Sequence, residues 1–370
     1  MADHDADVRH ARLQPRCRAL RVTRVLLDVP HEVAGHCGSG SLRDLLAWAG
    51  LSYGRKPLSE PLAFALAGGL AFQYLRREDD TPPIYLVGRT GEMELEGCRR
   101  LGIDVAVRRT DDPGEGWRFV TDELDAGRPV MINADILELP YLRVQLSNTR
   151  HSLLVVGYDD DEGVAYLVDN DRADLQEVAL PALDRARSTA GFPDPPRYAT
   201  YPMRFPDRLP ALLDVARSAC ADAVRHLDLG RGLFPEGTLD GVVVDATGTA
   251  GVRTFADDLA GWGEVLGADE LATSLRALRV FIEKAGTGTG MFRRLQADGL
   301  REAGERTGDE ALLAAAGAWR LAADAWSALA SATGDGVAAA AAAADELPGL
   351  EARALEATRV AAEGRTADGG

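Results

Sequence analysis

The sequence predicts an α+β protein in two parts, an antiparallel sheet with packed helices followed by an α-helical domain. Strand-like and helix-like patterns alternate over the first half of the chain. The stretch HSLLVVGYDDDEGVAYLVDN contains two apolar runs around an Asp/Gly turn, which is typical of an antiparallel hairpin. A proline-rich segment, GFPDPPRYATYPMRFPDRLP, separates this half from a sequence rich in Ala, Leu, Arg and Glu, which favours helices.

Local patterns predict the elements of the first part in order. A helix is expected from Cys37 to Gly50, because apolar side chains recur there at helical spacing: Leu42, Leu45, Leu46 and Ala49. Ser59 is the expected N-cap of a second helix that continues to residue 75. A third helix is expected between residues 116 and 127. Strand-like apolar runs lie at residues 21–30, 82–88, 103–107 and 128–136.

These patterns divide the chain into five segments. Residues 1–24 are an N-terminal extension, and residues 25–190 are the sheet-bearing domain that carries the candidate site. The proline-rich linker spans 191–210, the helical domain spans 211–364, and residues 365–370 are a tail.

The charge balance excludes some functions. With 41 Lys and Arg against 58 Asp and Glu, the formal net charge is −17, and no run of residues offers the concentrated basic face that nucleic-acid binding needs. An acidic surface suits a cationic substrate. Neither a signal peptide nor a membrane-spanning apolar run is found, so a cytoplasmic protein is expected. The four cysteines form no CxxC pair, so no metal site or disulfide framework is predicted.

The stretch GHCGSGSLRDLLAWAGL places Cys37 in a Gly/Ser-rich turn at the start of a predicted helix. Free N–H groups and the macrodipole at a helix N-terminus favour a thiolate, and so lower the pKa of a thiol from its usual value of about 8.5. The N–H groups of Cys37, Gly38 and Ser39 are candidates for holding an oxyanion, and Gly38 lets a substrate approach closely. The alternative is a buried structural thiol.

The predicted hairpin brings a histidine and a carboxylate together. Its expected turn spans Asp159 to Gly163. This register places Asp169 opposite Leu153, with His151 as the diagonal neighbour on the same face. A carboxylate on one ring nitrogen supports the imidazolium that a Cys–His pair needs. Taken singly, the histidine is more often a hydrogen-bonded strand-end residue and the aspartate a turn residue.

The order Cys37, His151, Asp169 is the pattern of a papain-like site and favours a catalytic interpretation. His36 is a competing base, although a residue adjacent in a turn seldom points at its neighbour's sulfur. His31 lies six residues before Cys37, where papain-like enzymes often keep an oxyanion-stabilising glutamine. It is therefore a candidate for that role, with a surface histidine as the alternative.

Several stretches resemble the butirosin biosynthesis protein H-like family. The first part does so through HCGSGSLRDLLAWAGL, LSEPLAFALAGGLAFQYL, GRPVMINADILELPYL and HSLLVVGYDDDEGVAYLVDN. The helical part resembles the domain that commonly follows, through LPALLDVARSACADAV, GVRTFADDLAGW and IEKAGTGTGMFRRL. The resemblance implies a papain-like cysteine fold that moves an aminoacyl group from a carrier-protein thioester to an aminoglycoside amine.

By position, the resemblance implies that Cys37 is the nucleophile, His151 the base and Asp169 its orienter. It also implies that Asp135 lines the cleft, whereas the alternative is a strand-end carboxylate in an internal hydrogen bond. The chain departs from the family's glycine-rich pattern by Ala in FALAGGLAF and by Thr289 in GTGTG, which leaves the acceptor open.

The segment GTGTGMFRR lacks the Gly-Lys-Ser/Thr ending of a phosphate loop and does not follow a strand. We expect a helix–helix junction that contributes to the cleft, with Arg293 or Arg294 meeting an anionic group. A plain capping turn is the alternative.

The predicted function is that of an amide-forming acyltransferase for natural-product biosynthesis, antibiotics included. The expected partners are an acyl carrier protein, whose phosphopantetheine arm brings the donor, and a small amine acceptor. No other cofactor, no nucleic acid and no membrane is expected. The carrier would dock on a basic patch, for which the candidates are Arg99, Arg100, Arg108 and Arg109, with an ordinary solvated surface as the alternative. A thiol amidohydrolase or peptidase with the same triad, and a non-catalytic carrier- or substrate-binding protein, are the alternatives.

Overall fold

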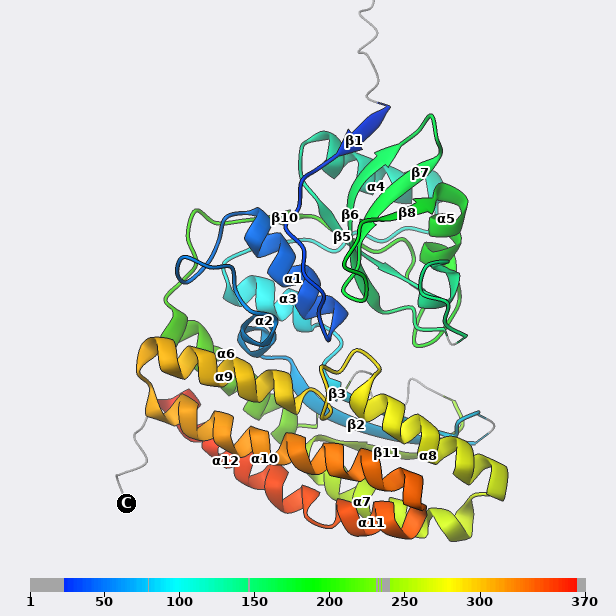
Figure 1. Cartoon of the computed structure of the whole chain (residues 1–370), viewed down its shortest axis with the longest axis vertical. Coiled ribbons are helices and arrows are strands. Elements are labelled where there is room, and N and C mark those ends of the chain that lie inside the picture. Colours follow the sequence, from blue (N-terminus) through cyan, green and yellow to red (C-terminus); the bar gives the residue numbers. More distant parts are fainter. Residues whose placement is uncertain are drawn as a thin grey trace, which may run out of the picture.

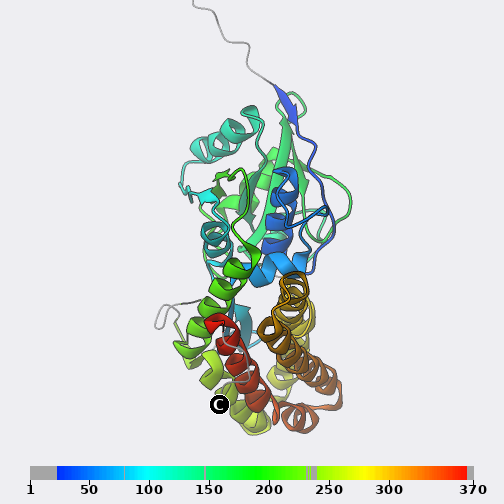
Figure 2. The ribbon, with the colours of Figure 1, turned by 90° about the vertical axis from the view of Figure 1, so that its left-hand side faces the viewer.

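The computed structural model describes residues 23–78, 80–145, 147–230, 232, 234 and 240–364. The predicted extension up to residue 22, Cys17 and the predicted tail lie outside these residues. Two lobes are stacked along the long axis of the molecule, one built around an antiparallel sheet and the other mostly helical (Figures 1 and 2). The predicted α+β class, with helices concentrated beyond the linker, is confirmed.

The sheet of the first lobe is antiparallel throughout, with strand order β8-β7-β6-β5-β9 and with β1 also paired to β6. Its strands are β1 (Arg24–Leu26), β5 (Val130–Ala134), β6 (His151–Asp159), β7 (Val164–Val168), β8 (Gln176–Ala179) and β9 (Thr200–Tyr201). Every residue of β6 is buried, because helices cover both faces of the sheet at this strand.

Alternate residues of β6 belong to two separate cores. Leu154 and Val156 pack with α1 (Cys37–Trp48) on one face of the sheet. Leu153 and Val155 pack on the other face with α4 (Pro113–Asp125) and α5 (Leu180–Ser188). The period-two alternation of a strand therefore fixes which face carries the helix that begins at Cys37.

The second helix is shorter than the sequence pattern predicts. Ser59 caps α2 (Glu60–Ala67) as expected, since its side chain accepts a hydrogen bond from the Leu62 N–H. The helix ends at Gly68, which has a left-handed φ of 67°. The apolar run that follows is the strand β2 (Leu70–Arg77), paired with β3 (Ile84–Arg89) and almost wholly buried. A run that is apolar on both faces has no period to separate strand from helix.

The hairpin β2–β3 belongs in space to the second lobe. It pairs with β11 (Val242–Thr247) in the order β11-β2-β3. The helices α7 (Gly248–Val265) and α8 (Ala268–Glu283) pack on this small sheet (Figure 1). The helices of the lobe are α6 (Leu212–Asp228), α7 (Gly248–Val265), α8 (Ala268–Glu283), α9 (Arg293–Thr307), α10 (Glu310–Ala332), α11 (Val337–Ala344) and α12 (Leu347–Glu363). The second lobe therefore contains a hairpin from before the predicted linker as well as the helices that follow the linker.

The predicted linker is itself built into the first lobe. It contributes β9 to the main sheet, and β10 (Met203–Arg204) pairs with β4 (Asp104–Val105). The remaining short elements are α3 (Met93–Arg100) and the 3₁₀ turns η1 (Ile136–Glu138) and η2 (Thr333–Asp335). Within the described part of the chain, no helix is both long and apolar enough to cross a membrane.

Candidate active site

Cys37 is the first residue of α1, as the sequence predicts. His36 is the N-cap, and its Nδ1 accepts a hydrogen bond from the Ser39 N–H at 3.1 Å. Among the described residues, no acceptor is recorded for the N–H groups of Cys37 and Gly38, which a helix leaves unpaired in its first turn. The thiol is 8% exposed and has these free donors beside it.

His151 and Asp169 meet as the hairpin register predicts. The Nε2 of His151 lies 2.8 Å from Oδ2 of Asp169, and both side chains are buried. Leu154 pairs with Val168, and the same register places Leu153 opposite Asp169. Nearer the turn the pairing is shifted by one, and an irregularity between Val155 and Gly157 restores the expected register.

The carboxylate of Asp169 has further donors. Tyr141 donates its hydroxyl to Oδ2 at 2.6 Å, and the Asp171 N–H donates to Oδ1 at 3.3 Å. Burial raises the pKa of Asp169, but the His151 imidazole and these donors outweigh burial and hold the pKa below its usual value. Sequence reasoning missed Tyr141, which carries no local signal and reaches the carboxylate from the segment after η1.

The pKa of the Cys37 thiol is lowered and the pKa of the His151 imidazole is raised, so their usual order is reversed. Burial raises the pKa of Cys37, but the neighbouring His36 and His151 outweigh it and bring the pKa well below its usual value. Burial lowers the pKa of His151, while Asp169 and a hydrogen bond with Cys37 bring it well above its usual value. Because Asp169 occupies Nε2, Nδ1 is the nitrogen left to face the sulfur. The arrangement favours a thiolate–imidazolium pair.

Alkylation with limiting iodoacetamide at neutral pH is expected to modify Cys37 far faster than Cys98 or Cys220. Burial raises the pKa of each of the other two thiols to about 12, so they stay protonated. Peptide mapping by mass spectrometry gives the measurement, in a Cys17→Ser background that removes the remaining cysteine. Equal labelling of the three thiols would contradict the assignment.

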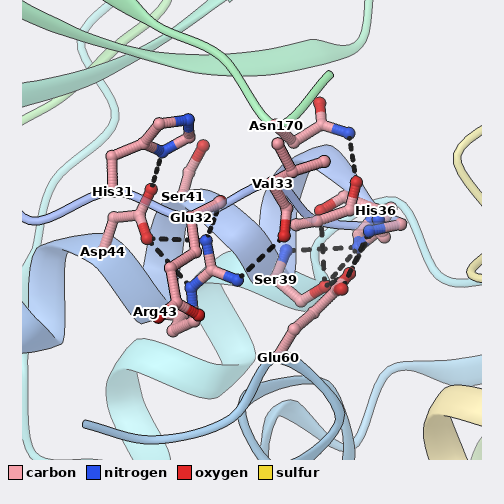
Figure 3. A network of polar contacts seen from close by, with 12 residues as sticks. His31, Glu32, Val33, His36, Ser39, Ser41, Arg43, Asp44, Glu60 and Asn170 are labelled. Atoms are coloured by element: carbon pink, nitrogen blue, oxygen red, sulfur yellow. Dashed lines mark hydrogen bonds and ion pairs between the residues drawn. The ribbon is translucent and has the colours of Figure 1, made fainter. Parts of the chain in front are cut away.

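The loop before Cys37 is fixed by Glu60, another residue that sequence reasoning missed (Figure 3). Its carboxylate accepts from the N–H groups of Gly35 and His36 at 2.8 and 2.7 Å, and from the Ser39 hydroxyl. On the other side, Asn170 exchanges two hydrogen bonds with the backbone of Ala34. The residue after Asp169 thus ties the hairpin to the cysteine loop.

His31 does not serve the oxyanion. Its Nδ1 donates to Asp44 at 2.6 Å (Figure 3). Its Nε2 donates to the Arg172 carbonyl at 2.7 Å, so both nitrogens are occupied. The bond to Asp44 raises the pKa of His31, as expected of an imidazolium that donates from both nitrogens. The prediction of an oxyanion role is therefore wrong. His31 and Arg43 are instead buried partners of Asp44.

Asp135 does not line the cleft, in contrast to what the resemblance implies. Its side chain is buried and accepts from the Leu137 N–H, the Asn148 N–H and the Ser147 hydroxyl. With these three bonds it shapes the turn that leads to His151. The alternative interpretation, an internally bonded strand-end carboxylate, is the one observed.

The GTGTG segment is the predicted helix–helix junction, between α8 and α9. It contacts the cysteine loop, because the Gly288 N–H donates to the Gly35 carbonyl at 3.3 Å and the Phe292 ring meets His36 edge-on at 5.4 Å. Neither arginine after it is free for an anion. Arg293 is fully buried against Glu351, and Arg294 bonds Thr289 and Asp324.

A cavity of about 680 Å³ lies between the two lobes. The triad side chains do not line it, but Glu94, which does, packs against Gly38, the residue after Cys37. The first lobe contributes Ser152, the residue after His151, together with Asn133, Tyr201 and Glu94. The second lobe contributes residues of the segment between α6 and β11, including Phe234. The helical lobe therefore supplies one wall of a substrate-sized space near the start of α1.

Comparison with known families confirms the resemblance. The family described as butirosin biosynthesis protein H, N-terminal, matches residues 36–170, which contain Cys37, His151 and Asp169. A domain of unknown function (DUF4872) matches residues 181–358. The comparison with curated proteins finds no match. The chain thus carries a domain of the butirosin biosynthesis protein H, N-terminal, family, followed by a DUF4872 domain.

Proposed function

We propose that the protein is a cysteine acyltransferase that moves an acyl or aminoacyl group from a carrier-protein thioester to an amine. The observation that carries the proposal is the thiol of Cys37 at a helix N-terminus, coupled to His151 and through it to Asp169. Membership in a family named for antibiotic biosynthesis supports the same reaction class.

In the first step the Cys37 thiolate attacks the thioester carbonyl. Collapse of the tetrahedral intermediate breaks the donor's C–S bond, and the departing phosphopantetheine thiol takes the proton of the His151 imidazolium. The N–H groups of Cys37 and Gly38 point from the start of α1 and are suited to hold the oxyanion. Exchange of one thioester for another is nearly isoenergetic, so no nucleotide is needed.

In the second step an amine attacks the acyl-enzyme. His151, now neutral, accepts the amine proton, the C–S bond to Cys37 breaks and the amide leaves, which restores the thiolate–imidazolium pair. Asp169 and Tyr141 keep the ring oriented through both steps. Aminolysis of a thioester is downhill, so the amide is the favoured product.

The cavity between the lobes supports an amine rather than water as the acceptor. Positioned reactants reach effective molarities of ~10⁵ M or more, against water at roughly 55 M. A site walled by a second lobe provides such positioning. For the acidic carrier protein, Arg99, Arg108 and Arg109 are exposed candidates for docking, whereas Arg100 is bound to Asp222 and to the backbone of α2.

The proposal is tested by intact-mass analysis followed by product analysis. Incubation with acyl-carrier or acyl-N-acetylcysteamine thioesters is expected to add one acyl mass to Cys37 and none to the Cys37→Ala variant. The loaded protein is then offered amines at millimolar concentration, and the ratio of amide to acid is measured. Acid as the sole product, with peptides cleaved instead, would favour the hydrolase. Absence of any acyl adduct would favour a binding protein.

A further inference from the structure

Glu94, in the first turn of α3, is a buried carboxylate without a partner. It is 7% exposed, and within the described part of the chain it makes no hydrogen bond and no ion pair. It lines the cavity between the lobes. A buried carboxylate is normally paired, because removing it from water without compensation is strongly unfavourable.

Glu94 lies close to the backbone beside the nucleophile. A Cβ added to Gly38, the residue after Cys37, would lie 1.9 Å from Glu94 Oε1. The carboxylate therefore packs against the backbone that offers N–H groups to the developing oxyanion. An uncompensated negative charge there opposes a second negative charge on the substrate carbonyl oxygen.

None of the described cations forms an ion pair with this carboxylate. Three arginines line the same cavity, but Arg150 pairs with Asp194 at 2.6 Å and Arg89 donates to the Thr90 carbonyl. Arg109 is exposed, and no arginine of the described residues comes within ion-pairing distance of Glu94. Among the described residues the carboxylate therefore has no cationic partner, and it lies at the wall of the cavity, where a ligand can reach it.

We propose that Glu94 binds an ammonium group of the substrate, and so selects acceptors that keep a second, protonated amino group while the first one attacks. This rests on the acyltransferase function proposed above. A primary ammonium is compact and supplies the hydrogen bonds that the carboxylate lacks. The same chemistry is present in an amino group on the transferred acyl chain, and the experiment separates the two sources.

The kinetic test compares 1,3-diaminopropane with n-propylamine as acceptors for the butyryl-loaded enzyme. Glu94→Gln is expected to lower kcat/KM for the diamine by about 10- to 100-fold, mostly through KM, and to change that for propylamine by less than about twofold. Glu92→Gln is the matched control, since it removes an exposed carboxylate at the rim of the same cavity, and should have little effect.

The donor arm repeats the acylation step with 4-aminobutyryl and butyryl N-acetylcysteamine thioesters. A Glu94→Gln defect confined to the aminobutyryl donor would assign the ammonium to the acyl chain instead of the acceptor. An equal loss for both amines and both donors would overturn the proposal, and so would no loss at all.

A binding measurement keeps the two proposals distinct. Calorimetric titration of 1,3-diaminopropane into the Cys37→Ala protein should show binding that Glu94→Gln weakens at least tenfold. This result needs no acyl transfer, so it supports the ammonium site even where the wild-type protein forms no amide. Equal diamine affinity with and without Glu94 would refute the site while leaving the acyltransferase function intact.

Discussion

Replacing His151 with alanine is expected to slow the acylation of Cys37 by a factor of ~10²–10⁴. The imidazole forms the ion pair with the thiol and moves the proton in both steps, and Asp169 fixes its orientation. His36 also lowers the pKa of Cys37, but its Nδ1 accepts the Ser39 N–H as the cap of α1 and is not free to take a proton. The acylation rate is measured by quenched-flow mass spectrometry. Asp169→Asn is expected to slow acylation less, since the carboxylate only orients the base.

The pH dependence of alkylation gives the diagnostic readout for the same variant. In the wild-type protein the pKa of Cys37 is lowered and that of His151 is raised, so thiolate and imidazolium coexist between the two values. Without His151, less remains to offset the effect of burial, so the pKa of Cys37 rises and the alkylation profile shifts to higher pH. If His151→Ala acylates at the wild-type rate, or if its alkylation profile against pH is unchanged, His151 is not the catalytic base.

The parts of the site that depend on local sequence were predictable. The helix start at Cys37 follows from apolar periodicity and a Gly/Ser-rich turn, and the cap comes from the adjacent His36. The meeting of His151 and Asp169 follows from hairpin counting, but only because the irregularity near Val155 cancels a one-residue shift at the turn. Nothing in the sequence predicts that irregularity, so the correct facing depended on a feature that counting does not reveal.

The parts that depend on distant partners were not predictable. The strand β2 looks helical, because it follows Ala67 in one apolar run and finds its partner β11 far along the chain. His31 and Asp135 are polar residues near the site whose ring and carboxylate are occupied by other segments. Conversely, Glu94 gains its significance only from the absence of such partners, which no single-sequence pattern records.

Replacing Arg293 with methionine is expected to lower the free energy of unfolding by about 3–5 kcal/mol, because it leaves Glu351 charged, buried and without its cation. The guanidinium bonds both oxygens of Glu351, at 2.7 and 3.2 Å, and neither side chain is more than 1% exposed. It also donates to the carbonyls of Ala71 and Met291, and so joins β2 to the junction before α9. Urea unfolding followed by circular dichroism measures the loss.

Arg294→Met is the matched control for this prediction. Its partner Asp324 is exposed and its own side chain is only partly buried, so the expected loss is below about 1 kcal/mol. In the double variant Arg293→Met/Glu351→Leu the buried charge is gone, and the loss should be smaller than that of Arg293→Met alone. If Arg293→Met and Arg294→Met lower the free energy of unfolding equally, the burial of the Arg293–Glu351 pair does not account for the loss. A large loss for Arg293→Met would show that the buried pair with Glu351 anchors the GTGTG junction, which contacts the loop before Cys37 through Gly288.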